Sequence, residues 1–492
     1  MSNFSQAFSI FEHHLTFAFM HEKNNPKTLT AWAMYDWANS VYNLLITTAI
    51  FPIYYRNAVK GAFGVAGTNE SGQEVILVEF FGFSIKSSAL YSYAISFSFL
   101  LVVILSPILS GVADYSGRKK FFMQFFTYLG ASACLLLYFF EGANVEFGIA
   151  MATTASLGFA GSLVFYNAFL PEIATEDRFD QLSARGYSLG YIGSVLLLIV
   201  VLFFVMNPDL LFSAQIEAAA AQLEAEGLDK KTAVSQAQTP YVNLITRYSF
   251  LMVGLWWIGF AQIPFARLRD LPGKGKAATQ ELLTKGIREL RKVANVLSGY
   301  ADMRSYLLAF FLYSVGVQTV MLLAPTFAQG ELNIETTGLI LIVLIIQLIA
   351  IGGAYLFAQL SKYRGNRFSL LTMIGIWLFV CISAYLVQTA EQFYVLAIFV
   401  GLVMGGIQSL SRSTFSKLIP EDTLDHASFF SFYDITEKLA IVIGTASFGL
   451  IDQLTGSMRN SALVLMVFFV LGGVILARTN IRSGRRMSQL ED

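Results

Sequence analysis

Long apolar segments recur along the chain and are separated by short polar connections. A helix needs roughly twenty residues to cross about 30 Å of hydrocarbon, so each segment is long enough to span a bilayer. About twelve such segments are predicted, which indicates an all-α membrane protein. They lie near 31–56, 88–113, 120–140, 146–171, 185–206, 247–268, 304–328, 335–360, 368–389, 392–418, 426–453 and 459–478.

The first predicted helix carries a polar stripe. Asp36, Asn39 or Ser40, Asn43 and Thr47 recur at helical spacing and therefore share one face. A carboxylate in a lipid-spanning helix costs roughly 2.5–3.5 kcal/mol, so it normally faces the bundle interior or a watery path. We therefore predict that this helix lines an aqueous cavity. The residues of the opposite face, which suit lipid or helix packing, are Trp32, Leu44, Ile46 and Ile50.

Composition and charge placement agree with a membrane protein. Of the 492 residues, 55% are hydrophobic and 13% are charged, whereas soluble domains have about 25% charged residues. The 33 basic residues balance the 33 acidic ones, so no nucleic-acid partner is expected. Lys and Arg gather at alternate connections, which predicts that both termini are cytoplasmic.

Two connections are longer than the others. Residues 207–240 are rich in Ala, Gln and Glu, and 212–227 is predicted to form a short amphipathic helix on the extracytoplasmic side. Residues 284–297 predict a basic amphipathic helix lying on the cytoplasmic lipid headgroups. The predicted parts are a tail at 1–30, a first half at 31–270 with an insert at 207–246, a linker at 271–303, a second half at 304–480 and a tail at 481–492.

The chain contains a weak internal repeat at an offset of about 248 residues. Residues 113–119 align with 361–367 and keep a Tyr, a Gly and a basic residue. Pro171 and Pro420 lie near the ends of the fourth and tenth predicted helices at almost the same offset. Such repeats predict two pseudo-symmetric six-helix halves with a binding site between them, as in secondary transporters.

The predicted connection at 110–120 resembles the signature loop of the major facilitator superfamily, G-x-L-A-D-R-x-G-R-[RK]. Asp114 ends a helix, Gly117 permits a tight turn, and Arg118 can pair with Asp114 or Glu172. Such a cluster can close the cytoplasmic side in one state and open it in another. A loop that only sets membrane orientation is the alternative. The sequence departs from the motif with Ser110 in place of its first Gly and Tyr115 in place of its Arg.

Three further stretches resemble one branch of this superfamily. They are 35–40 in the first predicted helix, 405–413 in the tenth, and 429–434 with Lys438 in the eleventh. The branch is related to the fungal autophagy-linked vacuolar amino-acid effluxers, and the resemblance covers the chain from Thr30 onward. It implies a major facilitator fold and a permease of a bacterial inner membrane that exports amino acids.

The charged residues of the predicted eleventh helix allow two arrangements. Asp434 and Lys438 are four residues apart and can pair with each other, whereas Glu437 is turned about 100° from Lys438. Alternatively, Asp36 pairs with Lys438 or Arg412 across the cavity and releases it when a proton, a sodium ion or the solute binds. Both arrangements remain open at this point.

Polar side chains in other apolar helices complete the predicted cavity. Each of them either forms a hydrogen bond between helices or contacts the solute. The full set of candidates is Asp36, Asn39, Asn43, Tyr166, Asn167, Gln318, Gln408, Arg412, Asp434, Glu437 and Lys438.

Signatures of enzymes and of ATP-driven pumps are missing from the sequence. No G-x-x-x-x-G-K-[ST] motif occurs, and neither a metal site nor a cofactor is predicted. The four histidines, His13, His14, His21 and His426, are expected in tails or loops. We therefore expect a monomeric secondary transporter that moves a small polar solute by alternating access within membrane lipid. The alternatives are efflux of amphipathic drugs or lipids, and a receptor or scaffold that transports nothing.

Overall fold

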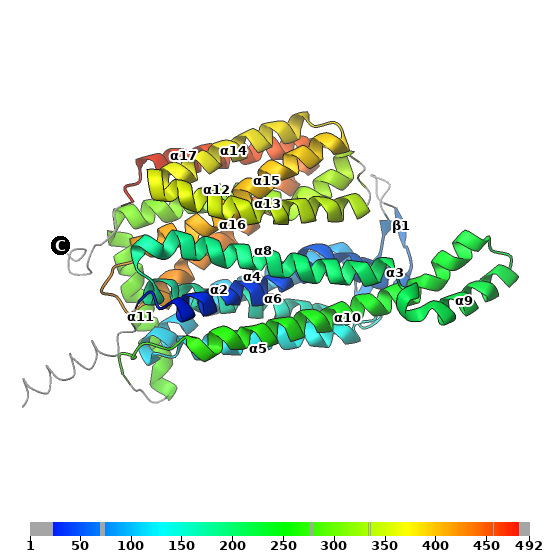
Figure 1. Ribbon diagram of the computed structural model, residues 1–492, viewed down its shortest axis with the longest axis horizontal. Helices are drawn as coiled ribbons and strands as arrows, with labels where there is room; N and C mark the ends of the chain where they lie inside the picture. The colour runs from blue at the N-terminus through cyan, green and yellow to red at the C-terminus, as the bar shows by residue number, and fades with distance from the viewer. Residues whose placement is uncertain are drawn as a thin grey trace, which may run out of the picture.

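The computed structural model describes residues 23–68, 74–275, 279–332, 334, 336–455 and 457–481. Most of the two predicted tails lies outside these residues. Within the described residues, ten helices are long and apolar enough to cross a membrane. Figure 1 shows one bundle in which α12 to α17 form one layer and α2 to α10 form the other. The end of the bundle that holds α11, called the α11 end below, is the one predicted to be cytoplasmic.

The helices match the predicted spans within a few residues at most ends, and this confirms the fold class. All helices of the described residues, including the connecting helices α9 and α11, are α2 (Pro26–Val41), η1 (Tyr42–Ala49), α3 (Phe51–Phe63), α4 (Ser87–Ser116), α5 (Lys119–Leu136), η2 (Leu137–Phe139), α6 (Val145–Ala168), α7 (Leu170–Ile173), α8 (Glu176–Met206), α9 (Asp209–Ala225), α10 (Lys230–Arg267), α11 (Thr279–Gly299), α12 (Ala301–Leu332), α13 (Thr336–Arg364), α14 (Asn366–Leu386), α15 (Ala390–Leu418), α16 (His426–Thr455) and α17 (Met458–Arg478). The predicted spans 31–56 and 426–453 are not among the ten apolar helices. Residues 31–56 are divided among shorter elements, and α16 carries charged residues in mid-helix.

The first span is not the single regular helix that its pattern predicts. After α2, the backbone widens into the π-helix η1, and α3 begins at Phe51 with Pro52 in its first turn. Proline cannot donate a backbone hydrogen bond, so it suits a new helix start. Short π-helical segments often occur at functional sites. Asn43 and Thr47, the last two residues of the polar stripe, lie within η1.

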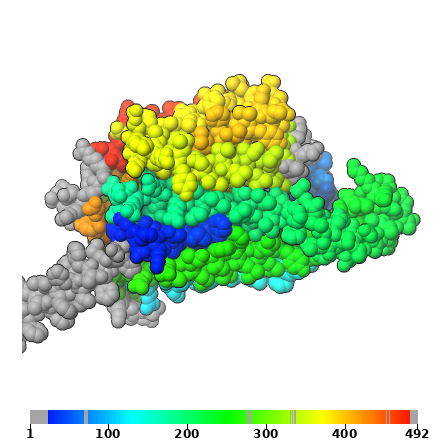
Figure 2. Space-filling view, viewed as in Figure 1, coloured from blue at the N-terminus to red at the C-terminus, as the bar shows by residue number. Residues whose placement is uncertain are grey.

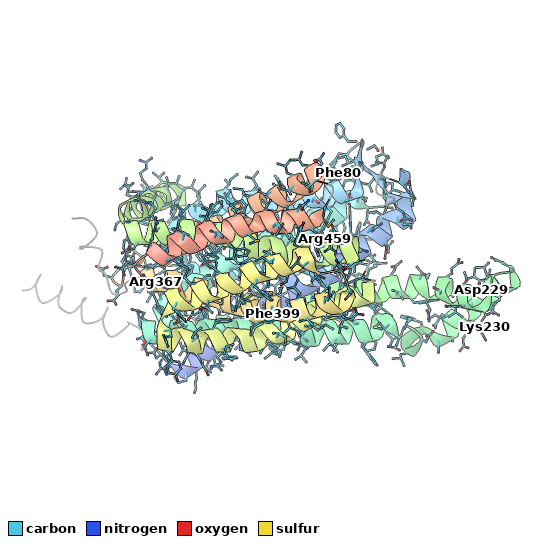
Figure 3. All side chains as sticks on the ribbon, turned by 90° about the horizontal axis from the view of Figure 1, so that it is seen from above. Phe80, Asp229, Lys230, Arg367, Phe399 and Arg459 are labelled. Atoms are coloured by element: carbon cyan, nitrogen blue, oxygen red, sulfur yellow. The ribbon has the colours of Figure 1, made fainter. Side chains whose placement is uncertain are left out.

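Two small hairpins join α3 to α4, and the sequence analysis did not predict them. Strand β1 (Gly67–Thr68) pairs with β2 (Glu74–Val75), and β3 (Leu77–Phe80) pairs with β4 (Phe83–Lys86), both antiparallel. Phe81 and Gly82 turn the second hairpin with φ of 49° and 81°, as a tight two-residue turn requires. Figure 3 shows Phe80 at the end of the bundle opposite α11.

The insert between the fifth and sixth predicted spans is a helical hairpin. It consists of α9 and the first turns of α10, and it projects beyond the rest of the molecule (Figure 2) with Asp229 and Lys230 at its tip (Figure 3). Asp229 caps α10 by accepting a hydrogen bond from the Thr232 backbone at 3.0 Å. Because α10 runs without a break from Lys230 into the bundle, the predicted insert boundary at 246 lies inside a helix.

The outer surface of the bundle is apolar where a membrane would surround it. On α4, for example, Tyr93, Phe97, Leu100 and Ile104 are all exposed and share one helix face. An exposed apolar stripe of this length is typical of a lipid-facing helix.

The internal repeat is visible at two equivalent connections. Gly117 ends α4 with φ of 64°, and Gly365 separates α13 from α14 with φ of 82°. Residues other than glycine rarely adopt a positive φ, so both connections depend on glycine. At Gly117, a Cβ would also lie 2.7 Å from the Leu271 carbonyl oxygen in the linker. The linker therefore packs directly on the signature loop.

We expect Gly117→Asn to lower the thermal stability of the purified protein. Asparagine tolerates a left-handed backbone, so the loss arises from collision of the new Cβ with the backbone at Leu271 and Gly273. The matched control is Gly227→Asn, because Gly227 also has positive φ but nothing lies within 4 Å of its Cβ position. Equal melting temperatures for the two variants would contradict the close packing of the linker.

Candidate functional site

An ion pair joins the first predicted span to the tenth at the centre of the bundle. Asp36 on α2 and Arg412 on α15 are 4% and 1% exposed. The two terminal nitrogens of Arg412 lie 3.3 and 3.2 Å from Oδ2 of Asp36, and the Tyr166 hydroxyl on α6 donates to the same oxygen at 2.8 Å. Of the two partners that the sequence left open, Asp36 contacts Arg412 and not Lys438.

Arg412 belongs to the second half, but the side chains that hold it belong to the first half. Its Nε donates to the Ser183 hydroxyl at 2.9 Å, and Nη2 donates to the Ser183 carbonyl at 3.0 Å. Nη1 donates to Asn167 Oδ1 at 3.2 Å. The guanidinium also lies 4.3 Å from the ring centre of Tyr187 and 4.8 Å from that of Trp32. Arg412 is thus a cation from one half inserted into a pocket of the other.

Helix α8 reaches this pair because it has a glycine at the contact. A Cβ at Gly186 would collide with Asp36 Oδ2 and would lie 3.1 Å from Arg412 Nη2. The contribution of α8 to the site, including Ser183 and Tyr187, was not predicted from the sequence. The sequence feature that could have indicated this role of α8 is the run of small and polar residues at 183–194. Ser183, however, precedes the predicted span at 185–206.

The polar stripe of the first helix is covered at Asp36 and exposed at Asn43. Asp36 and Asn39 are buried, Thr47 is half-buried, and Asn43 is exposed. The prediction of an aqueous cavity along the whole stripe is therefore wrong at Asp36, because Arg412 and its surrounding side chains cover that carboxylate. Trp32, assigned to lipid or helix packing, lies against the guanidinium of Arg412.

A second charged cluster, called the α16 cluster below, consists of Asp434, Glu437 and Lys438 on α16 with Gln318 on α12. Lys438 Nζ lies 3.4 Å from Asp434 Oδ1 and 3.1 Å from Glu437 Oε2. Gln318 donates to Glu437 Oε1 at 2.7 Å. The pairing of Asp434 with Lys438 that helical spacing allowed is present. Glu437 joins them, although the helical wheel placed it away from Lys438.

Gln408 makes a separate contact between the halves. It lies one turn before Arg412 on α15 and accepts a hydrogen bond from the Tyr191 hydroxyl of α8 at 2.8 Å. Its amide nitrogen lies 3.4 Å from the Met321 sulfur on α12. Gln408 therefore extends the α8–α15 contact and does not touch the Asp36 carboxylate.

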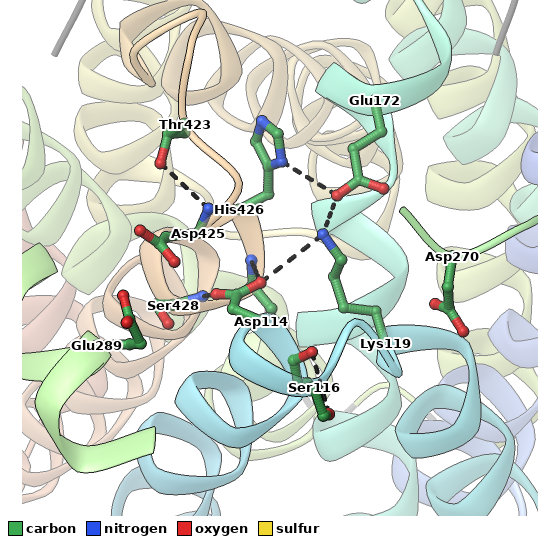
Figure 4. A network of polar contacts seen from close by, with 12 residues as sticks. Asp114, Ser116, Lys119, Glu172, Asp270, Glu289, Thr423, Asp425, His426 and Ser428 are labelled. Atoms are coloured by element: carbon green, nitrogen blue, oxygen red, sulfur yellow. Dashed lines mark hydrogen bonds and ion pairs between the residues drawn. The ribbon is translucent and has the colours of Figure 1, made fainter. Parts of the chain in front are cut away.

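The predicted gate residues meet the start of α16 at the α11 end (Figure 4). Asp114 accepts hydrogen bonds from the backbone nitrogens of Ala427 and Ser428 at 3.2 and 2.7 Å. These donors are in the first turn of α16, where a negative charge is favoured. A carboxylate of the first half thus caps a helix of the second half.

The basic partner in this gate is Lys119, and the prediction of Arg118 is wrong. Lys119 pairs with Glu172 and lies 3.7 Å from Asp114, while Arg118 is exposed. The left-handed turn at Gly117 directs Arg118 outward, and Lys119 begins α5 facing the gate. His426, expected in a loop, is buried at the start of α16 with Nδ1 at 3.0 Å from Glu172.

A second contact between the halves lies at the same end. Asp180 near the start of α8 is 2.8 Å from Lys417 Nζ, and it accepts hydrogen bonds from Asn366 and Ser361 at 2.9 and 2.8 Å. Ser361 and Asn366 flank the Gly365 turn, the repeat equivalent of the Gly117 turn. Each of the two equivalent connections therefore contacts the opposite half. The Asp114 and Asp180 contacts are called the two latches below.

The linker forms a third set of charged contacts at this end. Lys274 pairs with both Asp425, just before α16, and Glu289 on α11. Burial alone would lower the pKa of Lys274, but hydrogen bonds to these two carboxylates outweigh it and raise that pKa. Lys274 therefore remains charged and holds the linker against the start of the second half's α16.

Comparison with known proteins places the chain in a family. The family model described as "Vacuole effluxer Atg22 like" matches residues 24–217 and 227–489. The chain belongs to the Atg22-like family. This Atg22-like chain is 30% identical to the "Uncharacterized MFS-type transporter YxiO" of Bacillus subtilis, over 96% of the chain and 99% of that relative. It is 23% identical to "Autophagy-related protein 22-2" of Aspergillus niger, over 84% of the chain and 79% of that relative.

Solved structures show the same fold for the Atg22-like chain. The human organic anion transporter MFSD10 aligns with a TM-score of 0.64 at 10% identity, over 92% of this chain and all of that one. The major facilitator superfamily transporter FucP in the outward conformation aligns with a TM-score of 0.59 at 12% identity, over 93% and 99% of the two chains. The predicted membership in the branch of this superfamily related to the fungal effluxers is confirmed, and the chain is a multi-pass membrane protein.

Proposed function

We propose that this protein is an ion-coupled secondary transporter that carries amino acids across a bacterial inner membrane by alternating access. The observation that carries the proposal is the buried ion pair of Asp36 and Arg412 between the two halves. An amino acid presents one ammonium and one carboxylate group. Asp36 and Arg412 are the complementary charges, already placed together inside the protein.

The same pair explains how binding and opening can be linked. In the closed arrangement, Asp36 and Arg412 neutralise each other. If the halves separate, Asp36 is free to accept the ammonium group of a solute, and Arg412 can bind its carboxylate through two parallel hydrogen bonds. A zwitterion therefore replaces the contacts that the opened pair loses, which lowers the cost of exposing both charges.

The closed α11 end and the exposed part of the polar stripe lie in different parts of the bundle, and this supports alternating access. The gate residues and the second latch join the two halves at the α11 end, and Lys274 holds the linker against the second half there. Farther along the first span, the polar stripe includes the exposed Asn43 and the half-buried Thr47. This is the arrangement expected of an outward-facing state, in which the cytoplasmic side is closed.

Reconstitution into proteoliposomes with radiolabelled amino acids tests the proposal. We expect Asp36→Asn to abolish uptake or efflux at every pH, because the neutral amide cannot hold an ammonium group. Asp209→Asn is the matched control, since Asp209 is exposed at the start of the distant α9. Full transport by the Asp36→Asn variant would exclude Asp36 from the mechanism.

A further inference from the structure

The α16 cluster carries more negative than positive charge. Asp434 and Glu437 share the single cation Lys438, so one negative charge is in excess. Asp434 and Lys438 are only 4% and 6% exposed. A buried charge without a counter-ion costs several kcal/mol, so it normally attracts a partner.

One oxygen of this cluster is free to receive such a partner. Oδ1 of Asp434 lies near Lys438, but Oδ2 is buried and has no hydrogen-bond partner among the described residues. By contrast, Asp36 is neutralised by Arg412, and its Oδ2 also accepts from Tyr166. The excess charge and the free oxygen therefore belong to the same residue, Asp434.

Among the described residues, the side chains named here from the helices around the cluster carry no positive charge. From α12 come Gln318 and Tyr313, from α8 comes Tyr187, and α16 itself adds Tyr433. From α4, Phe99 faces Lys438, with its ring centre 5.8 Å from Nζ. The charged groups that act on Asp434 are Lys438 and Glu437. These neighbours are an amide, phenols and a phenyl ring, and none of them is cationic.

We propose that the α16 cluster binds one small monovalent cation, a proton or a sodium ion, at Oδ2 of Asp434. One excess charge matches one monovalent cation. Carboxylate and amide oxygens are ligands that hard cations accept, and Asp434, Glu437 and Gln318 supply them. A proton needs only the free oxygen. Resting on the proposed function, this assigns the coupling ion to α16 and the solute to the Asp36–Arg412 pair.

Tyr187 connects the two sites. Its ring lies 4.3 Å from the Arg412 guanidinium, and its hydroxyl is close enough to Glu437 and Lys438 to be within reach of their charges. A cation arriving at Asp434 changes the charge on one side of this ring while Arg412 occupies the other. Through the Tyr187 ring, ion binding at Asp434 can therefore change the strength of the Asp36–Arg412 pair.

The test uses the purified full-length protein and needs no identified solute. Melting temperature is measured in sodium chloride and in choline chloride at equal ionic strength, and the infrared band of protonated carboxyl groups is followed as pH is raised. If the ion is sodium, the wild type melts higher in sodium chloride, and Asp434→Asn removes that difference. If the ion is a proton, a carboxyl band disappears as pH rises, and it is missing from Asp434→Asn.

Two variants decide whether the effect belongs to this site. Asp36→Asn should keep the ion response, and so should Glu226→Gln, which removes an exposed carboxylate on the distant hairpin. The proposal is overturned if neither response occurs in the wild type, if Asp434→Asn retains it, or if Asp36→Asn loses it equally. Since these readouts involve ions alone, failure to transport amino acids would reject the proposed function without deciding the ion site.

Discussion

Arg412→Met is expected to destabilise the folded protein by about 3–5 kcal/mol and to abolish transport. The substitution leaves Asp36 buried with no counter-ion, which is the costly way to break a buried pair. It also leaves Asn167 and Ser183 without the donors that they now accept from. Thermal unfolding of the purified protein and flux into proteoliposomes measure the two effects.

A double substitution separates stability from transport. Asp36→Asn combined with Arg412→Met removes both charges, so most of the lost stability should return while transport stays absent. Arg412→Lys keeps the charge but lacks the planar guanidinium that contacts Asp36, Asn167 and Ser183 together. This variant should therefore fold, but it should transport poorly. A single Arg412→Met variant as stable as the wild type would show that the pair is not closed in the resting protein.

Cutting both latches is expected to open the α11 end. Asp114→Asn and Asp180→Asn weaken charge-assisted hydrogen bonds, which are worth about 1.5–3 kcal/mol each. Because about 1.4 kcal/mol changes a population tenfold, the double variant should be labelled at least about tenfold faster by a thiol reagent at a cysteine placed at Ala184. Ala184 is buried at the contact of α8 with α13, and both native cysteines are buried.

The matched control for the latches is Asp177→Asn. Asp177 is exposed one turn before Asp180, so its loss should leave labelling at residue 184 unchanged. Labelling that stays at the wild-type rate when both latches are cut would mean that other contacts close this end.

The spans could be predicted because their physical cause is local. A run of about twenty apolar residues is sufficient to place a membrane helix. The β3–β4 hairpin was missed because its turn, Phe81-Gly82, lacks the usual Asn-Gly or Asp-Gly signal. The π-helix η1 was missed because widening of a helix leaves the apolar pattern almost unchanged.

The sequence predicted which residues belong to the site better than it predicted which of them pair with each other. Asp36 and Arg412 each stood out as charges in apolar helices, but they are 376 residues apart in the sequence, and only packing brings them together. The pairing of Asp434 with Lys438 was one of two arrangements that the sequence allowed, because one helix turn separates them. Lys119 and Arg118 are neighbours of the same charge, and only the turn at Gly117 decides which one faces Glu172.

Reversible cross-linking across the interface of the halves tests whether they must separate at the α11 end during transport. Cysteines at Ala184 on α8 and Ala354 on α13 replace side chains that are buried together, and a short thiol reagent with a reducible link joins them. We predict that amino-acid transport in proteoliposomes stops on cross-linking and returns on reduction, since the halves must separate at this end in every cycle. Transport at the full rate by completely cross-linked protein would contradict the account.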